Sequence, residues 1–170
     1  MILGIFSLST YTTIHVLISL IGIVTGFVVL AAMAAGRRPG AWVSWFLLFT
    51  ILTSLTGFGF PFEKVTPGII VGILSLVVLL FAVLARYMFR LVGVWRWIFV
   101  ITAAIAQWFN VFVLIVQGFG RIDALKALAP RQSETPFLIA QLVVLAASVG
   151  LAIMAARKFH RFPQTCHGQF

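Results

Sequence analysis

The sequence predicts an all-α fold: a polytopic membrane protein, built as a five-transmembrane-helix bundle with one short interfacial helix. Composition is the first observation behind this prediction. Hydrophobic residues make up 62% of the 170 residues, charged residues only 9%, and the mean hydropathy is +1.17. A soluble domain of this size has too little interior to bury so much apolar surface. The composition therefore excludes a soluble enzyme, a disordered chain and a secreted disulfide scaffold.

Segment length is the second observation, because a membrane span needs about 20 mostly apolar residues. Five segments qualify, and we expect them to form a single domain of residues 1–158. They cover residues 11–35, 42–60, 67–87, 95–119 and 137–156. We expect residues 159–170 to form a short cytoplasmic tail.

The ends of these segments carry recognisable helix signals. The first is followed by Gly-Arg-Arg-Pro-Gly at 36–40, a strong helix stop. The second closes at two glycines and Pro61, and the third opens at Pro67, a favoured first-turn residue. The fourth begins at Trp95, and the fifth begins after Pro136 and ends before a basic pair, Arg157 and Lys158.

The connection at residues 120–135 has a helical pattern of its own. Ile122, Leu125 and Leu128 recur at helical spacing, with Asp123 and Lys126 on the other side. This pattern predicts a short amphipathic helix on the membrane surface, although a lid over a site would have the same pattern.

Basic residues predict the orientation. An odd number of spans places the two termini on opposite sides. Eight basic residues fall on one side and four on the other, and the positive-inside rule places the eight in the cytoplasm. The eight are Arg37, Arg38, Arg86, Arg90, Arg96, Arg157, Lys158 and Arg161; the four are Lys64, Arg121, Lys126 and Arg131. The N-terminus is then outside and the C-terminus cytoplasmic.

The distribution of charge also predicts partners. Basic residues at helix ends suit anionic lipid headgroups on the cytoplasmic side, and the absence of a single basic face argues against nucleic acid. All three acids, Glu63, Asp123 and Glu134, fall on the predicted outer side. Their spacing leaves open whether they act together.

Polar residues within the outer half of the spans form the candidate binding site. By depth, these side chains could line one outward-facing cavity: His15, Thr56, Asn110, Gln117 and Gln141. The last turns of the fourth span carry a polar stripe that also includes Gln107. Two interpretations stay open. The residues form interhelical hydrogen bonds, or they bind a quinone head group, a lipid or a small neutral solute.

We predict no catalytic residues, no metal site and no bound cofactor, because the sequence has no phosphate loop, HExxH, GxSxG or Cys-x-x-Cys motif. The polar cluster could still bind the head group of a quinone. Haem is disfavoured, because His15 has no second intramembrane histidine. His160, Cys166 and His167 lie in the tail, which is too short to fix the three or four ligands of a zinc site.

Small residues recur at three- or four-residue spacing in three spans, which lets helix backbones approach closely. The stripes are Ser19, Gly22 and Gly26; Gly68 and Gly72; and Ser148, Ala152 and Ala156. The spacing fits packing within the chain, and it equally fits a homo-oligomer or a larger membrane complex.

Four stretches carry a resemblance to known proteins: residues 14–23, 56–62, 85–87 and 132–137. They resemble an uncharacterised family of small bacterial inner-membrane proteins that has no assigned activity. The resemblance runs from about Ile14 to Arg157 and implies a bacterial inner membrane and one five-helix domain. It implies no reaction. The tryptophan-rich sensory proteins are similar in size, but their Trp-Pro motifs are not matched.

For function, the sequence favours a non-enzymatic membrane component, such as an accessory subunit or an assembly factor. A binder or facilitator of a small polar or lipophilic molecule is the first alternative, and it would use the outer polar cluster. A quinone- or lipid-handling membrane enzyme is the second. Ion-coupled transport is disfavoured, because no ionisable group lies near the middle of a span.

Overall fold

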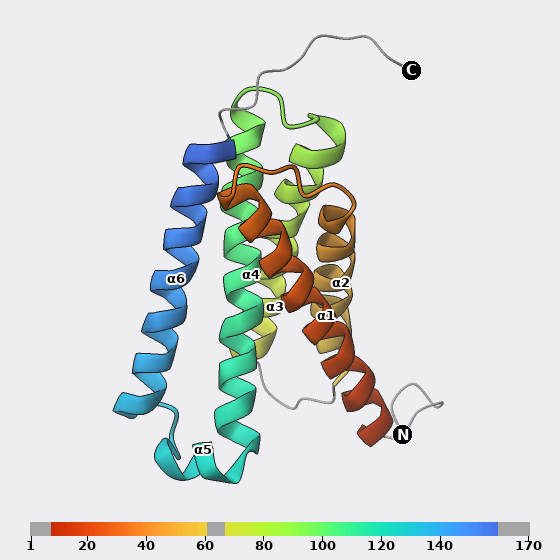
Figure 1. Ribbon diagram of the computed structural model, residues 1–170. Coiled ribbons are helices and arrows are strands. Elements are labelled where there is room, and N and C mark those ends of the chain that lie inside the picture. The colour runs from red at the N-terminus through yellow and green to blue at the C-terminus, as the bar shows by residue number, and fades with distance from the viewer. Residues whose placement is uncertain (1–7, 61–66, 160–170) are drawn as a thin grey trace.

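The computed structural model describes residues 8–60 and 67–159, and every regular element in this part of the chain is helical. The elements are α1 (Leu8–Ala34), α2 (Trp42–Gly57), α3 (Pro67–Val83), a π-helical turn η1 (Leu84–Met88), α4 (Val94–Arg121), α5 (Asp123–Leu128) and α6 (Thr135–Phe159) (Figure 1). The predicted all-α class is confirmed. Glu63 and tail residues 160–170 lie outside the described residues.

Four of these helices are long and apolar enough to cross a membrane: Leu8–Ala34, Gly68–Met88, Val94–Arg121 and Thr135–Phe159. Each overlaps one of the predicted spans. The remaining predicted span, α2, is a shorter apolar helix of 16 residues. At about 1.5 Å per residue it is about 24 Å long, which is less than the roughly 30 Å of a typical hydrocarbon core. The described part of the chain therefore contains four candidate spans.

The end of α2 at Gly57 has a local cause. Hydropathy alone continues the segment to Phe60, but the Tyr11 hydroxyl donates a hydrogen bond to the Thr56 carbonyl at 2.7 Å. The Gly59 N–H also bonds that carbonyl at 3.1 Å, and a Cβ on Gly59 would overlap the Tyr11 hydroxyl. The terminal carbonyl of the helix is thus satisfied by a turn and by α1, so the chain leaves the helix there.

Helix α4 lies at the centre of the bundle and contacts α1, α3 and α6 (Figure 1). Helix α1 contacts α2 and α6 as well. Helix α6 buries only Phe137, Ala155 and Phe159 among its 25 residues. Its remaining surface is largely apolar and exposed, as expected for a helix that faces lipid.

Two groups of buried residues hold the bundle together. The larger lies among α1, α2, α3, α4 and the end of α6, and it includes the fully buried Phe46, Phe99 and Met33. The smaller consists of Phe119, Ala129 and Phe137, and it holds α5 against α4 and α6. Leu125 packs against the smaller group, whereas Ile122 and Leu128 are exposed. A helix of six residues, α5, thus lies within the predicted stretch 120–135, and Ile122 precedes it in an extended conformation.

Candidate functional site

Of the five predicted site residues, His15 and Thr56 are brought together. The His15 Nδ1 lies 2.7 Å from the Thr56 Oγ1, which itself donates to the Leu52 carbonyl at 2.7 Å. The Phe60 ring makes T-shaped contacts with two rings of α1. Its centroid lies 5.2 Å from that of the His15 ring and 5.1 Å from that of the Tyr11 ring. These contacts link α1 to the end of α2.

Asn110 lies deeper, in a buried polar layer among α1, α2 and α4. Its Nδ2 donates to the Thr50 Oγ1 at 3.1 Å, and both side chains are buried. One turn earlier in α4, the Gln107 Nε2 donates to the Ile23 carbonyl at 3.0 Å. Gln107 is only 1% exposed and lies against Gly26, where any Cβ would overlap its Oε1. Gly26 is thus the residue that leaves room for this amide.

The last two predicted residues bond elsewhere. Gln117 is exposed and accepts a hydrogen bond from the Arg121 Nε at 3.0 Å, one turn along the same helix. Gln141 donates to the Phe112 carbonyl at 3.4 Å, across the contact between α6 and α4. The five residues are therefore distributed over four separate contacts.

Glu134 also has a local partner. Its carboxylate accepts the backbone N–H groups of Arg131 at 3.1 Å and Ser133 at 3.0 Å, in the turn before α6. Partial desolvation raises the pKa of this carboxyl, but these two bonds and the charge of Arg131 outweigh it and hold the pKa below its ordinary value. Asp123 is exposed at the start of α5.

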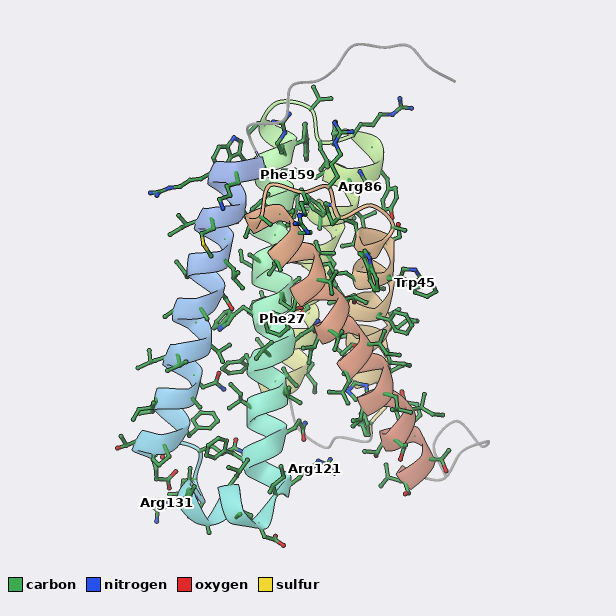
Figure 2. The ribbon with its side chains drawn as sticks, in the orientation of Figure 1. Phe27, Trp45, Arg86, Arg121, Arg131 and Phe159 are labelled. Atoms are coloured by element: carbon green, nitrogen blue, oxygen red, sulfur yellow. The ribbon has the colours of Figure 1, made fainter. Side chains whose placement is uncertain are left out.

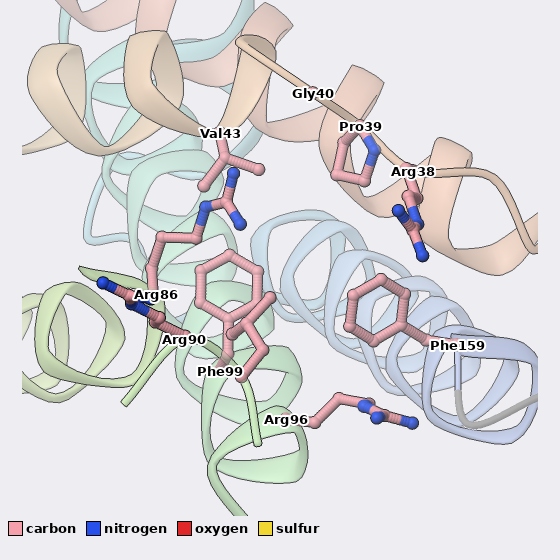
Figure 3. A pocket seen from close by; sticks show the side chains of 10 residues that line it. Arg38, Pro39, Gly40, Val43, Arg86, Arg90, Arg96, Phe99 and Phe159 are labelled. Carbon is pink, nitrogen blue, oxygen red and sulfur yellow. The ribbon is translucent and has the colours of Figure 1, made fainter. Parts of the chain in front are cut away.

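A cavity of about 370 Å³ lies at the opposite end of the bundle, and sequence reasoning did not single it out (Figure 3). Four arginines line it: Arg38, Arg86, Arg90 and Arg96. Val43, Phe99 and Phe159, all buried, give it an apolar floor. Figure 2 places Arg86 and Phe159 at this end and Arg121 and Arg131 at the other. No acidic residue is among the described residues that line the cavity.

The backbone around the cavity is irregular. Helix α3 ends in the π turn η1, in which the Phe89 N–H bonds the Leu84 carbonyl at 3.0 Å. Arg90 and Leu91 follow with φ of 49° and 59°, a left-handed conformation that costs a residue with a Cβ about 1–2 kcal/mol. Such π turns occur frequently at functional sites. Here the π turn contains Arg86, and Arg90 follows it directly, so both cavity-lining arginines lie on this irregular backbone.

Arg86 has the most constrained position in the cavity. Its side chain extends toward Val43 beside the Phe99 ring (Figure 3). The Nε is buried and has no hydrogen-bond partner. A buried donor without an acceptor is destabilising, and the Arg86 side chain lines the cavity, so a rotation that turns this nitrogen toward an acceptor there would be favourable.

Buried polar atoms without partners also occur on α4 and α6, at the Gln107 Oε1, the Trp108 Nε1 and the Gln141 Oε1. Among the described residues, no three His, Cys, Asp or Glu side chains form a group that could hold a metal ion. No protein-family model, curated protein or solved structure matches this chain. The geometry of the described residues is therefore the only basis for assigning a function.

Proposed function

We propose that this chain is a non-enzymatic, multi-pass component of a bacterial inner membrane, acting as an accessory subunit or an assembly factor. The observation that supports this proposal is the pairing of polar side chains between helices. His15 with Thr56, Asn110 with Thr50, and Gln107 with the Ile23 carbonyl each join two helices. Hydrogen bonds of this kind hold a bundle together, because lipid offers polar groups no alternative partner.

The same proposal includes five spans, with the N-terminus outside, the C-terminus cytoplasmic and α5 in the outer interface. The short helix α2 would cross with its flanking residues or with local thinning of the bilayer, which costs only fractions of a kcal/mol per Å of mismatch. A reporter fused after Phe170 should read cytoplasmic, and one inserted near Gln132 should read external. The reverse pattern, or both reporters on the same side, would contradict this topology.

Native mass spectrometry of the protein released gently from its own membrane tests the functional proposal. We expect it to carry other subunits at a fixed ratio. Variants T56V and N110L should keep this assembly, because they remove bonds inside the chain at a partly buried and a buried position. The alternative function predicts instead a protein without other subunits that carries one small molecule of defined mass, lost in both variants. That result would overturn the proposal in favour of a binder.

A further inference from the structure

We propose that the arginine cavity is a binding site for a phosphate-bearing anion, either the headgroup of an anionic lipid or free phosphate. This inference goes beyond the proposed function and does not depend on the orientation of the chain. It stands on three observations: the set of cationic side chains, the buried donor of Arg86 and the shape of the cavity.

The cationic set matches the chemistry of phosphate. Arg38 comes from the loop after α1, Arg86 from η1, Arg90 from the loop that follows, and Arg96 from the first turn of α4. Residues from three separate stretches of sequence thus converge on one cavity. Guanidinium groups present planar forks of donors that fit phosphate oxygens in pairs, which a single ammonium group cannot do.

Arg86 supplies the observation that indicates a ligand. Its Nε is buried without a hydrogen-bond partner, and the side chains beside it, Val43 and Phe99, are apolar and almost fully buried. An apolar wall strengthens the attraction between a cation and an anion, since it excludes the water that screens charge. The described lining has no carboxylate, so an anion has no competing acid there. Because the Arg86 side chain lines the cavity, a small rotation of its guanidinium would bring this donor to a phosphate oxygen.

The cavity has the size of a small-molecule site. Its volume of about 370 Å³ lies at the lower end of the range of roughly 300–1,000 Å³ that is typical of ligand pockets. It also lies where the helices end, close to lipid headgroups if the bundle spans the bilayer (Figure 2). A headgroup phosphate could enter from the side, and free phosphate from the aqueous side.

Native mass spectrometry in detergent tests this proposal with two probes, phosphatidylglycerol and inorganic phosphate. Phosphatidylcholine, which has no net charge, is the comparison lipid. We expect one anionic molecule to bind. Arg86→Gln and Arg90→Gln should each weaken it about tenfold or more, because each removes a charge-assisted bond. Lys126→Gln is the control, since it removes one positive charge from an exposed position on α5.

The two probes distinguish the sources of the anion. Binding of phosphatidylglycerol that inorganic phosphate does not displace assigns the site to a lipid headgroup. Binding of inorganic phosphate with similar affinity assigns it to the free anion. The proposal is overturned if neither probe binds one-to-one, if both arginine variants bind as the wild type does, or if Lys126→Gln loses as much binding as they do.

Folding of the variants needs its own check, because Arg86 is half-buried. Arg90 is exposed, so Arg90→Gln should fold normally and keep the test valid. Arg86→Lys retains the charge but loses the fork, and we expect it to bind more weakly than the wild type and more tightly than Arg86→Gln. Equal binding by Arg86→Lys and Arg86→Gln would mean that the charge at this position has no role.

Discussion

Gly26 is the position in α1 where a single added methyl group has the clearest consequence. In Gly26→Ala, the new Cβ would overlap the Gln107 Oε1, and it would lie 2.7 Å from the Gln107 Cδ and 2.8 Å from the Phe46 Cε2. Carbon atoms in contact normally lie about 3.5–4.0 Å apart. Gln107 is 1% exposed and Phe46 is fully buried, so neither has free space into which it can retreat.

The expected loss of stability follows from three contributions. Overpacking of this kind costs about 1–3 kcal/mol, and displacement of the Gln107 amide also loses its bond to the Ile23 carbonyl, worth about 0.6 kcal/mol on average in membrane proteins. Alanine favours the helix over glycine by up to about 1 kcal/mol. The net expectation for Gly26→Ala is a destabilisation of roughly 1.5 kcal/mol, measured by reversible unfolding in mixed micelles titrated with sodium dodecyl sulfate.

Gly22→Ala is the matched control, one turn away in the same small-residue stripe. Its Cβ would lie 3.5 Å from the Phe49 carbonyl carbon and the Thr50 nitrogen, which is ordinary contact. We expect no loss of stability there. In Gly26→Ala combined with Gln107→Ala, the amide no longer occupies the space, so the combined loss should fall short of the sum by about 1 kcal/mol. Equal behaviour of the two glycine variants, or strict additivity of the pair, would refute this account.

Two further predictions concern the end of the bundle opposite the arginine cavity. Thr56→Val removes the contact with His15 and should lower the free energy of unfolding by about 0.6 kcal/mol. Thr53→Val should have a smaller effect, because the Thr53 hydroxyl bonds the Phe49 carbonyl of its own helix. Equal effects of the two variants would mean that the interhelical contact adds nothing to stability. The folded-state pKa of Glu134 is depressed, so its bonds to Arg131 and Ser133 stabilise the turn above the unfolded-state pKa and are lost as pH falls through the folded-state pKa. The amide chemical shifts of Arg131 and Ser133 should therefore titrate below the ordinary range of a glutamate, and Glu134→Gln should abolish that titration; a midpoint at or above the ordinary value would contradict the assignment.

Helix positions could be predicted from the sequence, because apolar length and helix-stop residues determine them. The first predicted segment, 11–35, corresponds to α1, and the fourth, 95–119, to α4. The end of α2 could not be predicted in this way. It depends on Tyr11, a residue 45 positions earlier, which takes the Thr56 carbonyl. Hydropathy carries no information on such a contact.

The residues of the candidate site, too, could be predicted only in part. Depth along a helix follows from counting residues, and it correctly groups His15 with Thr56. Direction around a helix follows less directly: the small-residue stripe of α1 marks the buried Gly22 and Gly26, but nothing in the sequence marks the direction in which Gln117 of α4 or Gln141 of α6 points. Gln117 and Gln141 therefore share a depth with His15 while bonding Arg121 and the Phe112 carbonyl. The count of basic residues groups Arg86 with Arg38, Arg90 and Arg96, and these four side chains line one cavity, but the count indicates neither the π turn nor the cavity.

The polar side chains within the helices and those at the basic end of the bundle lie in different environments. Within the helices, most Ser and Thr hydroxyls bond carbonyls of their own helix, and a few side chains, such as Asn110 with Thr50, bond a neighbouring helix, since hydrocarbon cannot supply partners. The arginine cavity is a different environment: it lies at the helix ends, where charge is tolerated, yet its floor is apolar and the Arg86 Nε is buried without an acceptor. The binding site that we propose therefore lies at the basic end of this bundle, whereas Asn110 and Thr50 join two helices within it.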